Sequence, residues 1–142
     1  MPNQTEASAT LCADLKARID ALYLNYVFPV LATIRLGEDP ETVRFETALL
    51  LAAKETGVRV RRYIFPADTP LADIETLLRE TSLDFLLSAI LLERPLPQGW
   101  DGAALDELIA PAKRLPQPEG ATLTDAVLLL QKVADAAERN AK

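Results

Sequence analysis

Apolar residues near the start of the chain recur at intervals of four, four and three positions. This spacing predicts one buried face of a helix that ends near Leu24. The residues of this face are Leu11, Leu15, Ile19 and Leu22. A short apolar run then follows at residues 30–36 and stops at Gly37, which indicates a strand.

The next segment carries start and stop signals for a second helix. Asp39 is predicted to cap it, Pro40 stands at its first position and Gly57 follows its last. Leu and Ala dominate residues 48–53, so we expect this helix to be largely buried on all sides.

Residues 58–65 alternate between apolar and polar side chains, which predicts a strand with one wet face at the edge of a sheet. Thr69 and Pro70 then open a third helix. Its predicted inward positions are Leu71, Ile74 and Leu78.

The run at residues 85–92 is almost continuously apolar, as in a strand that is covered on both faces. Three features follow it: a proline-rich exit at residues 93–97, a short helix at about 103–109, and prolines that interrupt the chain until Gly120. A last helix begins near Thr122, which forms a predicted capping box with Asp125.

This order of elements, α-β-α-β-α-β-α-α, predicts one α/β domain over residues 1–142 with three layers, α-β-α. We expect a short, mostly parallel sheet of about three strands in the order 2-1-3, with right-handed crossovers. In that sheet the strand of residues 85–92 lies inside, beside residues 30–36, and residues 58–65 form the edge. The last helix is expected to pack back on the domain.

Composition excludes several kinds of chemistry. The chain has no histidine and one cysteine, Cys12, which excludes a Ser-His-Asp or Cys-His triad, an intrachain disulfide and a metal site built on histidine or several cysteines. The net charge is −6, and the one tight basic cluster, residues 59–62, is expected at a wet sheet edge, so no nucleic acid partner is predicted.

No membrane partner is predicted either, because no apolar run approaches the roughly 20 residues of a bilayer span. The first ten residues lack the basic and apolar regions of a signal peptide, so we expect a cytoplasmic protein. The five glycines form neither G-x-G-x-x-G nor a P-loop, so no nucleotide site is predicted. Parallel sheets bind ligands beyond the carboxyl ends of their strands, here residues 37–45, 65–69 and 93–97.

Four segments in this order resemble one family. Residues 29–42, PVLATIRLGEDPET, resemble P-x-L-A-V-I-L-V-G-x-x-P-A-S, and residues 90–97, ILLERPLP, resemble I-L-V-Q-L-P-L-P. Residues 111–113 resemble P-x-K, and residues 116–129 resemble P-V-P-G-G-V-G-P-M-T-x-A-x-L-L with one residue deleted. All four patterns belong to the methylenetetrahydrofolate dehydrogenase/cyclohydrolase family.

This resemblance implies a catalytic domain from which the NAD(P)-binding Rossmann domain is missing. Residues 113–120 are then a spliced junction, and residues 122–141 are the helix that returns to the catalytic domain. It follows that no nicotinamide cofactor is expected, and a folate derivative is the one small molecule that the resemblance suggests.

The resemblance also places the family's active-site residues. Its stacking tyrosine falls on Phe45, its proton-transferring lysine on Leu49 and its glutamine on Glu93, and the prolines of the exit fall on Pro95 and Pro97. Phe45 keeps a ring that can stack on a flat ligand, whereas Leu49 can neither donate nor accept a proton. We therefore predict these five positions as a ligand site without an established catalytic residue.

Glu93 leaves two interpretations open. It is a replacement acid/base whose pKa an apolar site raises, or it is an ion-paired or solvated carboxylate. Three other residues are assigned structural roles: Lys54 points about 140° away from position 49, Lys113 is solvated, and Trp100 packs under a loop.

The predicted function is accordingly a degenerate domain of this family that binds a flat ligand or acts as an interaction or regulatory module. The alternative is an active cyclohydrolase, or another hydrolase, that uses Glu93. Whether the chain is an enzyme stays open. A homo-oligomer or a partner protein is expected on surface that the missing domain would cover, around Leu115, Leu123 and the outer face of the last helix.

Overall fold

The computed structural model describes residues 4–141, and side chains from Ser8 onward. Its eight elements follow the predicted order. They are α1 (Gln4–Leu24), β1 (Val30–Leu36), α2 (Pro40–Thr56), β2 (Arg59–Phe65), α3 (Leu71–Leu83), β3 (Ala89–Leu92), α4 (Gly102–Asp106) and α5 (Leu123–Asn140). The expectation about a signal peptide falls partly on residues 1–3, which lie outside this range.

The three strands form one parallel sheet in the order β2-β1-β3, which confirms the predicted topology. All seven residues of β1 pair with β2, and four of them also pair with β3. The outer edge of β3 is covered by the chain beyond α4. There, the Ile90 amide donates to the Lys113 carbonyl at 2.7 Å, and the Leu115 amide donates to the Ile90 carbonyl at 3.3 Å.

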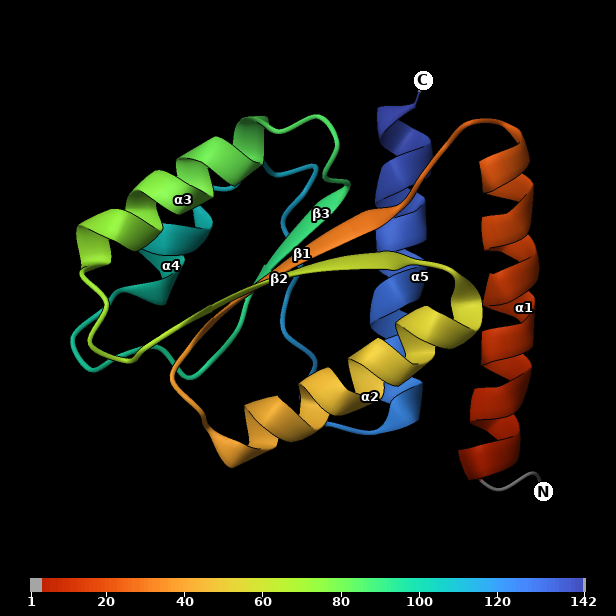
Figure 1. Cartoon of the computed structure of the whole chain (residues 1–142), viewed down its shortest axis with the longest axis horizontal. Helices are drawn as coiled ribbons and strands as arrows, with labels where there is room; N and C mark the ends of the chain where they lie inside the picture. Colours follow the sequence, from red (N-terminus) through yellow and green to blue (C-terminus); the bar gives the residue numbers. More distant parts are fainter. Residues whose placement is uncertain (1–3, 142) are drawn as a thin grey trace.

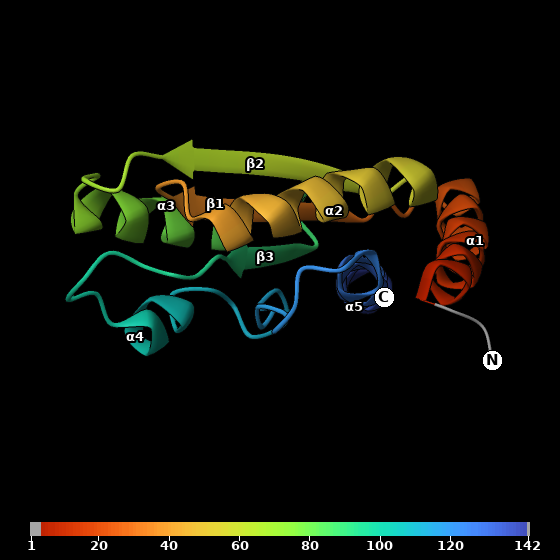
Figure 2. The same cartoon turned by 90° about the horizontal axis from the view of Figure 1, so that it is seen from below.

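Helices cover both faces of the sheet (Figures 1 and 2). α1, α2 and α5 pack together on one face, and α3 and α4 lie on the other. Alternate side chains of β1 point to opposite faces of the sheet. Leu31 points to the first face, whereas Ala32, Ile34 and Leu36 point to the second. The C-terminal helix therefore packs back on the domain, as predicted.

Local signals place the helix ends. The Asp39 carboxylate accepts the Thr42 amide at 3.2 Å, and Gly57 ends α2 with a φ of 90°, a left-handed conformation that favours glycine. At the start of α5, the Thr122 hydroxyl accepts the Asp125 amide at 3.1 Å and the Asp125 carboxylate accepts the Thr122 amide at 3.0 Å. The predicted capping box is thus confirmed.

Five details of burial and strand placement were predicted wrongly. α2 is not buried all round, because Leu51 is 50% exposed, and the wet face of β2 includes Ile64. Leu71 lies on the exposed side of α3. The apolar run at residues 85–92 is a strand only from Ala89, and β1, not β3, is the central strand. An apolar composition alone does not distinguish a covered strand from a turn that lines an open cavity.

No helix within residues 4–141 combines the length and the apolarity that crossing a bilayer requires.

Candidate functional site

A groove of about 340 Å³ lies at the carboxyl ends of the strands, between α2, the exit from β3 and the loop of residues 117–121. Phe45 and Pro95 line it. The other predicted site residues lie outside its lining: Leu49, Glu93 and Pro97. The structure therefore brings only two of the five predicted residues to a shared open surface.

Hydrogen bonds to the Arg94 backbone hold the walls of this groove together. The Thr42 hydroxyl of α2 donates to the Arg94 carbonyl at 2.7 Å. From the opposite wall, the Gln117 side chain donates to the same carbonyl at 3.3 Å and accepts the Arg94 amide. Both walls are therefore tied to one residue of the β3 exit, and hydrogen bonds within the protein set their positions.

Phe45 and Leu49 lie one turn apart on α2 and face the core between α1 and α5. Phe45 is 3% exposed and Leu49 is 1% exposed. Most of the Phe45 ring is therefore packed against the protein, and only a small part reaches the groove floor. Leu49 is one of the largest fully buried side chains, so its position is closed to solvent.

A cluster of charged side chains lies between α2 and the sheet, and none of its members lines the groove. Arg35 of β1 donates through Nη1 to Glu46 Oε2 of α2, and its Nε donates to the Gly37 carbonyl at 3.0 Å. Arg62 of β2 lies 3.9 Å from the same Glu46 oxygen. Both members of the Arg35–Glu46 pair are buried, so this is an ion pair held inside the domain.

Glu93 belongs to this cluster, since it follows β3 and its carboxyl group interacts with Glu46. It is 1% exposed, and neither oxygen meets hydrogen-bond geometry with another described residue. Burial, and next the negative charge of Glu46, raise the pKa of Glu93 to about 9, although Arg35 and Arg62 act in the opposite direction.

Glu93 is therefore a protonated, neutral acid at neutral pH. A carboxyl group of this kind resembles a glutamine amide in shape and charge and can donate a hydrogen bond. The simple interpretations of Glu93 as a solvated or an ion-paired carboxylate are wrong, because the site is closed to solvent and Arg35 is paired with Glu46 instead.

Among the residues given structural roles, Lys113 differs from its prediction. Its Nζ donates to the Asp84 carbonyl at 2.6 Å, and burial lowers its pKa while Asp84 acts in the opposite direction. It is thus a half-buried tie between two loops and not a solvated lysine. Lys54 is exposed, and Trp100 packs against the core on the α3 side, as predicted.

Arg35 and Glu46 are the site residues that sequence reasoning missed. Arg35 is the one charged residue in the mostly apolar strand segment VLATIRL, and this interruption was the available signal. Glu46 gives no comparable signal, because glutamate is common in helices and its burial depends on how α2 sits over the sheet.

A larger cavity of about 550 Å³ lies at the amino ends of the strands, and none of the predicted site residues lines it. The sequence-based prediction placed a ligand site only at the carboxyl ends of the strands, so it did not include this cavity. Size alone does not identify the family site. The two predicted site residues that reach an open surface, Phe45 and Pro95, line the smaller groove instead.

The sequence model of the tetrahydrofolate dehydrogenase/cyclohydrolase catalytic domain matches residues 3–115. Curated relatives include the bifunctional protein FolD 3 of Ectopseudomonas mendocina, which is 30% identical over 75% of this chain and 35% of its own length. The bifunctional protein FolD 2 of Frankia alni is 39% identical over 60% of this chain and 30% of its own length. The chain thus spans about a third of these relatives.

Solved structures show the same fold. The bifunctional FolD enzyme of Campylobacter jejuni superposes with a TM-score of 0.72 at 22% identity, over 76% of this chain and 38% of that one. A methylenetetrahydrofolate dehydrogenase-cyclohydrolase of Trypanosoma brucei gives a TM-score of 0.71, also at 22% identity, over 75% of this chain and 37% of that one.

Proposed function

This chain belongs to the family of the tetrahydrofolate dehydrogenase/cyclohydrolase catalytic domain, and we propose that it binds a folate-type ligand in the groove beside Phe45 without carrying out the family's proton chemistry. The observation that carries the proposal is Leu49, which is 1% exposed where the resemblance places a lysine. The groove and its aromatic floor are kept, while the group that would move a proton is replaced by core packing.

The neighbouring residues supply no evident substitute for that lysine. Arg35 is buried on the same side of the sheet, but its guanidinium is paired with Glu46. Lys54 is exposed on the other side of α2. A positioned acid or base contributes about 100- to 10,000-fold in rate, so its loss lowers turnover by that order.

The domain organisation is also part of the proposal. The family match ends at residue 115, and α5 packs on α1 and α2 directly after the loop that closes the groove. We infer that α5 takes the place of the family's returning helix and that residues 113–120 are the junction. Ligand binding in this arrangement requires no nicotinamide cofactor.

We expect calorimetry to detect binding of 5-formyltetrahydrofolate at millimolar or lower concentration, together with no hydrolysis of methenyltetrahydrofolate above the rate in buffer. Glu119 is exposed and lines the groove, so Glu119→Trp should fill part of the groove and weaken binding about tenfold or more. Glu107→Trp is the matched control, because Glu107 is exposed at the end of α4 and away from the groove.

Absence of heat at millimolar ligand would remove the binding proposal. Measurable hydrolysis would favour the second candidate, a cyclohydrolase in which the neutral Glu93 acts as a general acid. The pKa of about 9 is the observation behind that candidate. In that case Glu93→Gln should lower the rate about 100-fold, and equal rates in the two proteins would exclude Glu93 as the acid.

Binding to protein partners is a further part of the proposed role. Leu128 on the outer face of α5 is 43% exposed, whereas Leu115 and Leu123 are half-buried against the core. We propose that this surface supports a homo-oligomer or a partner protein. Light scattering that shows only monomer at high protein concentration contradicts the homo-oligomer.

A further inference from the structure

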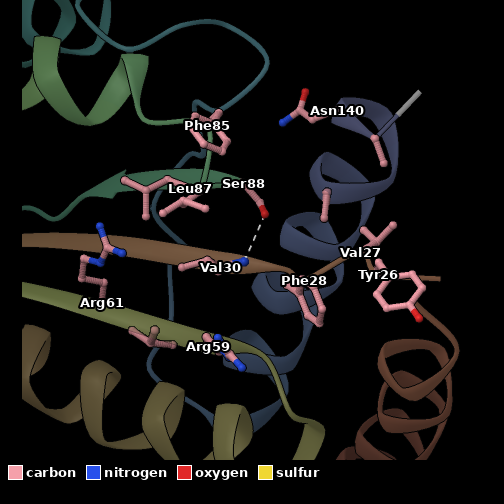
Figure 3. A pocket seen from close by; sticks show the side chains of 14 residues that line it. Tyr26, Val27, Phe28, Val30, Arg59, Arg61, Phe85, Leu87, Ser88 and Asn140 are labelled. Carbon is pink, nitrogen blue, oxygen red and sulfur yellow. Dashed lines mark hydrogen bonds between the residues drawn. The ribbon is translucent and has the colours of Figure 1, made fainter. Parts of the chain in front are cut away.

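The cavity at the amino ends of the strands is at the opposite end of the sheet from the proposed folate groove. Figure 3 shows the side chains that line this cavity. Four segments enclose it: residues 26–30, the start of β2, residues 85–88 and the last residues of α5. Its volume of about 550 Å³ falls within the range of roughly 300–1,000 Å³ that is typical of small-ligand pockets.

Apolar and aromatic side chains form most of this lining. Phe28 and Phe85 stand on either side of the strand ends in Figure 3, and Leu87 closes the cavity from β3's side. Phe85 is 90% exposed and Leu86 is 58% exposed, although apolar residues of this size are usually packed in a core. The cavity therefore presents an apolar surface that the protein itself leaves open.

The charge of the lining is unusual for this chain. The protein carries 21 acidic residues and a net charge of −6, yet none of the 14 lining residues is acidic and two are arginines. Arg61 pairs with Asp84 at 3.2 Å. Arg59 forms no ion pair with a carboxylate of the described chain, and its guanidinium lies 5.8 Å from the centre of the Phe28 ring.

One polar side chain in the lining is held in place. The Ser88 hydroxyl is mostly buried and accepts the Val30 amide at 3.0 Å (Figure 3). The Asn140 side chain adds an amide from the end of α5. An apolar lining with two polar side chains and one guanidinium without a carboxylate partner is the composition expected of a site for an amphipathic anion.

We propose that this cavity binds a small organic anion: a carboxylate that Arg59 recognises, attached to an aromatic or aliphatic body that packs against Phe28, Phe85 and Leu87. The site is separate from the folate groove and does not depend on the function proposed for it.

Three probes separate the two parts of this recognition. 4-Phenylbutyrate carries both the carboxylate and the apolar body, and 4-phenylbutan-1-ol carries only the apolar body. Butyrate carries the carboxylate but lacks the phenyl ring. In a titration followed by backbone amide NMR, we expect saturable shifts with 4-phenylbutyrate at Val30, Arg59 and Ser88. The alcohol and butyrate should each bind at least about tenfold more weakly than 4-phenylbutyrate.

Arg59→Gln should weaken 4-phenylbutyrate about tenfold and leave the alcohol unchanged. Arg79→Gln is the matched control, because Arg79 is exposed on α3 and does not line the cavity. The proposal is overturned if the acid and the alcohol bind equally well, if Arg59→Gln has no effect, or if the shifts map to Thr42 and Phe45. Shifts that follow protein concentration alone would instead assign the surface to a second copy of the chain and would equally overturn it.

Discussion

Replacing Glu93 by glutamine is expected to remove most of the dependence of stability on pH between about pH 5 and 9. The pKa of Glu93 is about 9 in the folded protein and near its ordinary value of 4.5 when the chain unfolds. Between these two values the folded state holds one proton more than the unfolded state. The free energy of unfolding therefore falls as pH rises, by about 1.4 kcal/mol per pH unit.

The sign of this effect distinguishes Glu93 from an ordinary surface carboxylate. Its contribution is fully present below pH 4.5 and is lost as pH approaches 9, whereas a carboxylate with a depressed pKa loses its contribution at acidic pH. A glutamine cannot ionise but keeps the size and the donor of the neutral acid. Glu93→Gln should therefore match the wild type near pH 5 and exceed its stability progressively at higher pH.

Urea denaturation at pH 5, 7 and 9 measures this difference. Glu80→Gln is the control, because Glu80 is exposed on α3 and should follow the wild-type slope. A wild-type free energy of unfolding that is constant from pH 5 to 9 would show that Glu93 is ionised in the folded protein, which would also remove the basis for its role as a general acid.

The order of the elements could be predicted from sequence because each boundary has a local cause. Pro40 and Gly57 fix the ends of α2, and the Thr122–Asp125 capping box fixes the start of α5. These signals depend on residues a few positions apart, so no knowledge of the tertiary structure is needed. The 2-1-3 order followed from the alternation of helices and strands and from the polar pattern of residues 58–65.

The buried cluster could not be predicted in the same way. Whether Arg35 meets Glu46 depends on the register of α2 over the sheet, which no residue near either of them determines. The resemblance identified Glu93 as a site residue but did not predict that its pKa is raised. That shift follows from burial and from the Glu46 carboxylate on α2. Similarly, the apolar run predicted that Phe85 belongs to a covered strand, but Phe85 lies in the turn before β3 and is exposed.

Removing Arg35 alone is expected to be the most destabilising change in this cluster. Arg35→Leu leaves the Glu46 carboxylate buried without its main partner, since Arg62 is 3.9 Å away and partly exposed. Breaking a buried ion pair by removing one member costs about 3–5 kcal/mol. We expect the free energy of unfolding of Arg35→Leu to fall by that amount in urea denaturation at pH 7.

The double variant Arg35→Leu/Glu46→Leu should recover most of this loss, because apolar side chains of similar volume replace a buried ion pair at little cost. Arg62→Leu is the control for removing an arginine from the same cluster, and its loss should stay below about 1 kcal/mol because its contact is long and half-exposed. A double variant as unstable as Arg35→Leu would show that the two residues are needed separately and not as a pair.

The same double variant connects this ion pair to the protonation of Glu93. The charge of Glu46 is, after burial, the main cause that raises the pKa of Glu93, while Arg35 acts against it. Removing Arg35 alone should therefore keep or steepen the fall of stability with pH, and removing both should reduce it. Since a purely steric role for Arg35 would change stability equally at every pH, the slopes of the two variants test whether Arg35 and Glu46 act on the ionisation of Glu93.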